Sequence, residues 1–416
     1  MNISAPQYGN ICRPISKGLY VNAFLLLLTV VIAITPVLNR NLPKLIYIGI
    51  ILLWYIEVFF SRRKPTYKAP NLAIPLFIWF CWELLLKVVG FSTAEIGNYF
   101  LVMCFFDLVY KSSYILQHYP ARWRHLLLRI IQIVVLLNIL DNIYLGHTIE
   151  NIHYYIYDAP DDYINLNVAQ TEFYNMLVYY IGICAYLLRT DHKFIHKVID
   201  LVALFCSYYF MLSFEARTTS LTLSILLLLV MFIISIKKRA TRILFLSFVA
   251  IVFIVIIGSE FDWLVAVLPE RVSLRLTALL KESLGSSDYT SRTVLLRNNI
   301  NTMFSSFSSF IFGVGNHLGS KYSSLIGQHS TITDYMAKYG CIGLAFIIFF
   351  FGRILKIFKA AVSNRSDSGL VYSFILIFIT ASVLSNTFGA ATAATGFVGL
   401  ALLINSTNTA SNGCYK

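Results

Sequence analysis

Charged residues are scarce in this chain. They make up 13% of its 416 residues and only 20 residues are acidic, whereas 58% are hydrophobic and the mean hydropathy is +0.71. Soluble globular domains average about 25% charged residues. The composition therefore excludes an ordinary soluble protein and indicates an integral membrane protein.

Signatures of several other classes are also missing. The seven cysteines form no CxxC motif and no two share an outer loop, which argues against a disulfide framework or a zinc site. The Gly313-Val314-Gly315 segment is followed by no Lys-Ser or Lys-Thr pair, so it is a poor nucleotide-binding loop. The alternating ten-residue pattern of a membrane β-barrel is absent, which leaves helices as the spanning elements.

Long apolar runs are what the chain does contain. A bilayer-spanning helix needs about 20 apolar residues. Twelve such segments are predicted, at 19–38, 43–60, 71–89, 96–116, 125–145, 168–188, 196–214, 218–236, 242–258, 341–358, 369–386 and 389–405. The predicted fold is an all-α polytopic membrane protein, a single membrane domain over residues 1–416, with one large loop at 259–340 between the ninth and tenth spans.

The distribution of basic residues predicts the topology. The net charge of +13 could indicate a nucleic-acid partner, but most basic residues fall in the short loops on one side of the predicted membrane. The short loops on the other side contain only Arg40, Lys44, Lys87 and Arg217. By the positive-inside rule both termini are cytoplasmic and the 259–340 loop is external. The charge is thus mainly a topology signal, and no nucleic-acid partner is expected.

The long external loop has helical periodicity. From Ser291 onward, one arginine and several apolar residues recur at three- and four-residue spacing, which predicts an amphipathic helix at the membrane surface. These residues are Arg292, Leu296, Ile300, Met303, Phe304 and Phe307. Arg297 is rotated by roughly 140° from Arg292 around such a helix. A further helix is predicted over Leu268 to Leu284.

Three residues at the predicted outer surface are the main candidates for chemistry. Arg217 lies in a short turn next to hydrocarbon, where a charge is costly; it is either functional, or forms a salt bridge with Glu215 or snorkels to the interface. Arg292 suits phosphate because guanidinium donates two parallel hydrogen bonds, although a lipid headgroup would serve it equally. His329 precedes a helix capped by Ser330 or Thr331, which would keep its imidazole neutral and able to accept a proton, or else it is structural.

Weaker candidates for substrate contact are Arg297, Asp334, Gly313 and Gly315. The two glycines predict a tight turn after the amphipathic helix that needs positive φ or a close backbone approach. No HxxxH or HxH pair occurs in the loop, so no metal site is expected. The outer loop at 146–167 is rich in tyrosine and carboxylates, which fits either interfacial anchoring or sugar recognition.

In this order, these features resemble the O-antigen polymerase and O-antigen ligase superfamily. The resemblance rests on twelve spans, a large outer loop between the ninth and tenth, Arg217 opening the eighth span and Arg292 heading a loop helix. It also rests on the GxG turn and on His329-Ser330 with Asp334 and Gly340 at the entry to the tenth span. The entry lacks the His-Asn or doubled histidine typical of ligases, and so looks more like polymerases.

The resemblance implies a metal-independent inverting glycosyltransferase without a cofactor, in the bacterial inner membrane and with its active face in the periplasm. Its partners would be membrane lipid, an oligosaccharide carried on undecaprenyl diphosphate and a chain-length regulator protein. Arg217 and Arg292 would hold the diphosphate, and His329 would contact it or act as the base.

Two alternatives remain open. The ligase branch would attach the polymer to lipid A–core instead of extending it. A flippase of lipid-linked sugars would place polar residues symmetrically near the bilayer midplane. The carboxylates of the predicted spans are scattered without such symmetry: Glu57, Glu83, Asp107, Asp141 and Asp200. Several of them are expected near span ends, where solvation is easy.

Overall fold

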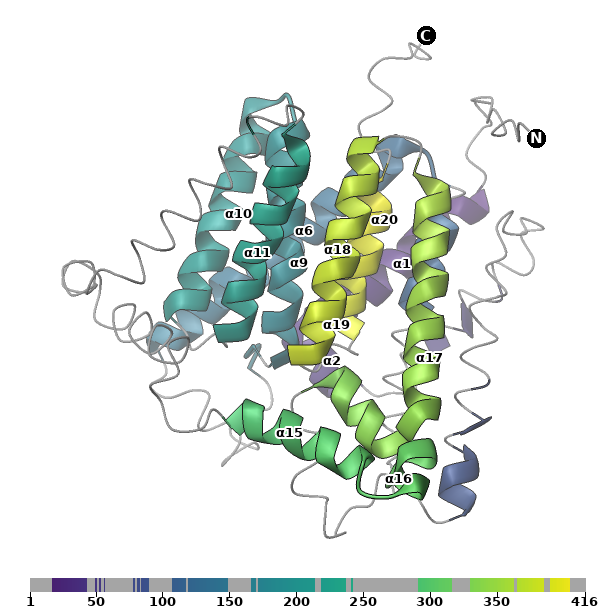
Figure 1. Ribbon diagram of the computed structural model, residues 1–416. Coiled ribbons are helices and arrows are strands. Elements are labelled where there is room, and N and C mark those ends of the chain that lie inside the picture. Colours follow the sequence, from purple (N-terminus) through teal and green to yellow (C-terminus); the bar gives the residue numbers. More distant parts are fainter. Residues whose placement is uncertain are drawn as a thin grey trace, which may run out of the picture.

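A computed structural model provides the three-dimensional structure of the chain. It describes residues 17–42, 49–50, 52–53, 56, 78, 81–82, 84–89, 107–116, 119–148, 166–169, 171–213, 218–236, 241, 291–315, 330–362, 365–384 and 390–404. Within these segments the regular structure is helical and no strand occurs. The all-α prediction is confirmed for this part of the chain (Figure 1).

The helices extend over the following residues, in chain order. They are α1 (Lys17–Ile34), α2 (Pro36–Asn41), α6 (Ala121–Thr148), α9 (Thr171–Thr190), α10 (Phe194–Ser213), α11 (Thr218–Ser235), α15 (Ser291–Met303), α16 (Phe307–Phe312), α17 (Thr331–Ala361), α18 (Arg365–Leu384), α19 (Ala390–Ala393), the π-helix η1 (Ala394–Val398) and α20 (Gly399–Leu403).

Three helical segments are long and apolar enough to cross a membrane: Arg122–Gly146, Phe194–Leu212 and Thr331–Ala361. Shorter apolar helices cover Tyr20–Ile34, Leu223–Ile233, Gly369–Val383 and Ala391–Leu403. The chain is thus an all-α membrane protein. Of the twelve expected spans, 242–258 lies outside the described residues, and 43–60, 71–89 and 96–116 are described only in part.

The first expected span, 19–38, is broken by a proline. The chain leaves the helical conformation at Thr35, whose φ and ψ are −98° and 111°, and α2 begins at Pro36. Proline disfavours the helical conformation of the residue before it and has no N–H to continue the ladder. The helix predicted for 19–38 is thus present up to Ile34, and its last four residues belong to the break at Thr35 and to α2.

The last helical segment lies at the centre of the bundle. All residues from Ala391 to Ile404 are buried. Small residues allow this, because helices that carry them approach closely. Gly396 lies against the ring of Tyr179, and a Cβ at Gly399 would collide with the Ile183 side chain.

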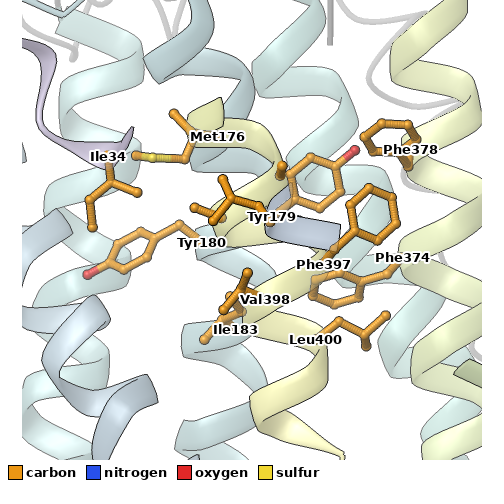
Figure 2. Close-up of a cluster of buried hydrophobic side chains, with 14 of the residues drawn as sticks. Ile34, Met176, Tyr179, Tyr180, Ile183, Phe374, Phe378, Phe397, Val398 and Leu400 are labelled. Carbon is orange, nitrogen blue, oxygen red and sulfur yellow. The ribbon is translucent and has the colours of Figure 1, made fainter. Parts of the chain in front are cut away.

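Aromatic side chains from α9 and α18 fill the space around this segment (Figure 2). The Phe397 ring lies 4.9 Å from that of Phe378, and Tyr179 lies 5.8 Å from Phe374, between ring centroids. The N-terminus of α19 is held by Glu172 of α9, whose carboxylate accepts a hydrogen bond from the Ala391 N–H at 2.7 Å. A carboxylate is favourable there because helix N-termini carry partial positive charge.

The two ends of the bundle differ. At one end, α15 and α16 cross below the bundle and pack against the start of α17 (Figure 1). α1 begins and α20 ends at the opposite end. Hereafter, the end formed by α15 and α16 is called the loop end, because both helices belong to the 259–340 loop. Of that loop, residues 291–315 and 330–340 are described.

Candidate functional site

The loop helix predicted from Ser291 onward is present as α15, and one of its faces packs on α17. Asn299 and Met303 are each 2% exposed, whereas Ile300 is 43% and Phe304 62% exposed. Of the predicted apolar face, Met303 is buried against the protein, whereas Ile300 and Phe304 lie on the protein surface; their contact with the membrane stays a prediction. The face packed on α17 thus carries both a polar residue, Asn299, and an apolar one, Met303.

The backbone of Arg292 lies on this packed face. It is seven residues before Asn299 and eleven before Met303, which places it within about 20° of both around the helix axis. Arg297 is on the exposed side of α15. The separation of the two arginines around the helix thus agrees with the predicted one, with Arg292 on the face turned to the protein.

Asn299 carries the polar contact between α15 and α17. Its Nδ2 donates to Oδ1 of Asp334 at 2.6 Å and to Oγ1 of Thr333 at 3.0 Å. Asp334 is 6% exposed, and its Oδ2 accepts from the N–H of Ser330 at 3.4 Å. One buried cluster of side chains therefore joins the loop helix to the first turn of α17.

Glycines bring the end of α16 against α17. Gly313 has φ 76°, and a Cβ there would collide with the backbone carbonyl of Lys338. Gly315, also at φ 76°, donates its N–H to that carbonyl at 3.0 Å. Opposite them, Gly340 forms a kink inside α17 with φ 59° and ψ −147°. The predicted tight turn with positive φ and close approach is confirmed.

Ser330 fixes the beginning of α17. Its side chain accepts from the Thr333 N–H at 3.2 Å, so it is the N-cap residue, one of the two predicted for that role. Its Oγ also donates to the backbone carbonyl of Ser382 near the end of α18, at 3.4 Å. His329, the residue before Ser330, lies outside the described residues.

The start of α11 belongs to the same end of the bundle. α11 packs along α18 and α9, and Ser220 in its first turn donates to Oδ1 of Asn175 at 3.4 Å. Arg217 directly precedes α11 but lies outside the described residues. The structure therefore describes the residues that follow two of the candidates: Thr218 after Arg217, and Ser330 after His329. For Arg292 it describes the helix backbone.

A second polar cluster at the loop end is structural. Nδ2 of Asn142 donates to the Asn138 and Asn167 carbonyls, each at 2.8 Å, and its Oδ1 accepts from the Ala169 N–H at 2.6 Å. Asn167 donates to Asn138 Oδ1 and Asp141 Oδ2 and accepts from the Val37 N–H. Because both amides are engaged by the protein on both sides, they serve to join α2, α6 and residues 166–169. The aromatic loop at 146–167 is almost entirely outside the described residues.

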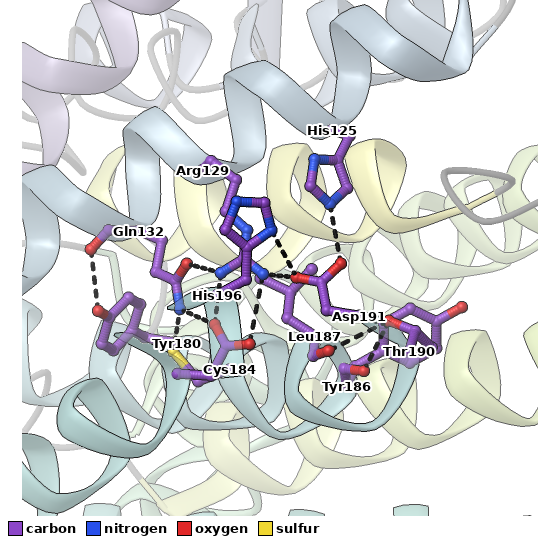
Figure 3. A network of polar contacts seen from close by, with 11 residues as sticks. His125, Arg129, Gln132, Tyr180, Cys184, Tyr186, Leu187, Thr190, Asp191 and His196 are labelled. Carbon is purple, nitrogen blue, oxygen red and sulfur yellow. Dashed lines mark hydrogen bonds and ion pairs between the residues drawn. The ribbon is translucent and has the colours of Figure 1, made fainter. Parts of the chain in front are cut away.

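The structure also assembles a network that the sequence analysis missed, between α6, α9 and α10 (Figure 3). Arg129 forms ion pairs with both Asp191 and Asp200, and Asp200 is completely buried. Gln132 donates to Asp200 Oδ1 at 2.7 Å. His125 Nε2 lies 3.3 Å from Asp191 Oδ1. Asp200 is one of the scattered carboxylates of the predicted spans, and in the structure Arg129 pairs with it.

Arg129 and Asp200 had a detectable signal, because both fall inside predicted spans, where ionisable residues seek partners. Their pairing was not readable, since 71 residues separate them in the chain. The network joins three helices at the turn between α9 and α10, the end of the bundle away from α15 (Figure 1). It is thus separate from the loop-end cluster.

Within the described segments, no three His, Cys, Asp or Glu side chains are arranged to hold a metal ion. No protein-family model matches the chain, and no curated protein matches it either. A function for the cluster of Asn299, Asp334 and Ser330 at the loop end therefore rests on the residues of this chain alone.

Proposed function

We propose that this chain is a periplasm-facing glycosyltransferase of the O-antigen polymerase type, metal-independent and inverting, in the bacterial inner membrane. It would move the growing glycan from undecaprenyl diphosphate to the non-reducing end of another lipid-linked repeat unit. The observation that supports the proposal is that the helices next to the three candidates begin at one end of the bundle. α11, which follows Arg217, packs on α18, and α15, which carries Arg292, packs on α17, whose first residues follow His329.

The proposed chemistry needs a cationic grip and a base. The acceptor hydroxyl oxygen attacks the anomeric carbon, the bond from that carbon to the diphosphate oxygen breaks, and the configuration inverts. Negative charge grows on the leaving diphosphate, and fixed guanidinium groups of Arg217 and Arg292 stabilise it. His329 takes the hydroxyl proton as a neutral imidazole, or else contacts the diphosphate.

The position of Arg292 on α15 supports this assignment. The backbone of α15 puts Arg292 on the helix face that carries Asn299, and a cation on a face that packs against protein needs an anionic partner. Arg297, on the exposed side, has access to lipid headgroups and water. Of the two, Arg292 is accordingly the one proposed to bind the diphosphate, and Arg297 contributes at most long-range attraction.

Deletion and substitution in the native host test the proposal. Deletion of a polymerase leaves lipopolysaccharide with a single repeat unit, whereas deletion of a ligase leaves bare core and deletion of a flippase leaves repeat units inside the cell. We expect the first pattern on a gel. Either of the other patterns would replace the polymerase proposal by that alternative.

Single variants test the site. Arg292→Ala should lower polymerisation about a hundredfold, since removal of one fixed donor to a developing negative charge has that order of effect. His329→Ala should do the same, whereas Arg297→Ala, the matched control on the same helix, should stay within a few-fold of the wild type. Long-chain polymer made by normally expressed Arg292→Ala and His329→Ala chains would refute the site assignment.

A further inference from the structure

We propose that Asn299 and Asp334 form a positioning pair that holds α15, and with it Arg292, in register with the first turn of α17; this rests on the proposed function. The pair is buried and close, with 2.6 Å between Nδ2 of Asn299 and Oδ1 of Asp334. Asp334 also accepts a hydrogen bond from the N–H of Ser330, the residue that follows His329. The pair therefore links α15 to the chain next to His329.

Asp334 is suited to this role and ill suited to contact with a diphosphate. A carboxylate beside a diphosphate repels it, unlike the arginine and histidine candidates. Its Oδ1 accepts from Asn299 and its Oδ2 from the Ser330 N–H, so the side chain is directed into the protein at the N-terminus of α17. Its negative charge there stabilises the helix.

Asn299 leaves one of its own atoms unsatisfied. Two acceptors, on Asp334 and Thr333, fix the Nδ2 side of the amide. Reversing the amide would place its oxygen against a carboxylate. Oδ1 is buried and, among the described residues, receives no hydrogen bond. A buried acceptor without a donor destabilises the folded state. An apolar side chain would avoid that penalty but would remove the hydrogen bond to the buried Asp334 carboxylate, so the amide is present for its contact with Asp334.

Helix geometry passes the constraint to Arg292. Asn299 lies seven residues after Arg292 on the same face, about 10 Å along the axis of α15. A helix held at Asn299 can neither rotate nor slide without displacing Arg292. Contacts at Gly313 and Gly340 hold the end of α16 on α17. The segment from α15 to Gly315 is therefore held on α17 at Asn299 and again at Gly313.

A charge swap tests the pair. Asn299→Asp places two carboxylates face to face. Adding Asp334→Asn restores one amide donor and one carboxylate acceptor, with the roles of the two positions exchanged. With purified protein and lipid-linked repeat units, Asn299→Asp should lower kcat about a hundredfold, because small misplacement of a catalytic group has effects of that order. The double variant should recover to within about tenfold of the wild type. Asn142→Asp is the matched control, a buried asparagine on α6 whose hydrogen bonds in the described residues go to Asn138, Asn167 and Ala169, and its kcat per folded molecule should be unchanged.

Turnover is normalised to the monodisperse fraction in size-exclusion chromatography, so that variants are compared per folded molecule. Asn299→Asp with wild-type turnover, or a double variant as inactive as the single one, would overturn the positioning pair. If Asn299→Asp does not fold, Asn299→Ala replaces it, with the same kcat loss expected and wild-type turnover overturning the proposal. Active Arg292→Ala and His329→Ala chains would instead overturn the proposed function. If those two are inactive while Asn299→Asp is normal, only the positioning pair is lost.

Discussion

At the scale of single residues, glycines allow the backbones of α16 and α17 to come close together at the loop end. Gly340 is the clearest case, because a Cβ there would lie 2.6 Å from the carbonyl oxygens of both Phe310 and Ile311. Its φ of 59° is in the left-handed region, which side chains other than glycine adopt at a cost. Two independent penalties therefore fall on any substitution at this position.

Gly340→Ala should destabilise the docking of α16 on α17 by about 1–3 kcal/mol, the order of cost for a strained residue, plus the steric clash. Limited proteolysis of purified protein should then cut near α16 faster than in the wild type. Gly352→Ala is the control, since a Cβ there meets no atom within 4 Å. Equal cleavage rates for both variants would show that the kink at Gly340 does not hold the loop segment.

At the scale of elements, the bundle is joined by buried polar contacts between helices far apart in the chain. Arg129 is 8% exposed and faces two carboxylates, so the three groups carry one net negative charge if both carboxylates are ionised. Gln132 adds a hydrogen bond to Asp200, and its carbonyl accepts from the Tyr180 hydroxyl at 2.9 Å. Loss of the arginine would leave the carboxylates without their common cation.

Arg129→Met should lower the stability of the folded protein by about 3–5 kcal/mol, since breaking a buried ion pair from one side leaves an uncompensated charge. Asp200→Asn should cost far less, because Arg129 keeps Asp191 and the network becomes neutral. The fraction of detergent-solubilised protein that stays monodisperse after heating measures both. A melting midpoint for Asp200→Asn as low as that for Arg129→Met would contradict this account.

At the scale of the whole molecule, helix direction distinguishes the two faces of the membrane. α17 begins at the loop end and α1 begins at the other (Figure 1). Exposed residues are available for labelling at each: Ser308 on α16, and Lys193 in the turn between α9 and α10. The proposed topology assigns the first to the periplasm and the second to the cytoplasm.

Ser308→Cys should react with a membrane-impermeant maleimide in intact spheroplasts, whereas Lys193→Cys should react only after permeabilisation. The unsubstituted chain, with its own seven cysteines, provides the background to subtract. The reverse pattern would invert the topology and place α15 in the cytoplasm, where a periplasmic reaction at Arg292 is ruled out.

The sequence by itself determined the membrane class, the helical content and the local geometry around Ser330 and Gly313. These follow from composition, residue period and turn chemistry, which act over a few neighbouring residues. It also predicted α15 from its period, but not that Asn299 lies on the face packed against α17.

Only the tertiary structure decided what lies against what. Asn299 lies on the packed face of α15, and its partner, Asp334, is 35 residues away in the chain. Arg129 and Asp200, which read as separate charges along the sequence, neutralise each other across helices. The small residues from Ala391 onward let the last helical segment lie at the centre because α1, α6 and α9 pack against it. Such pairings depend on distance in three dimensions, which residue type and spacing along the chain do not give.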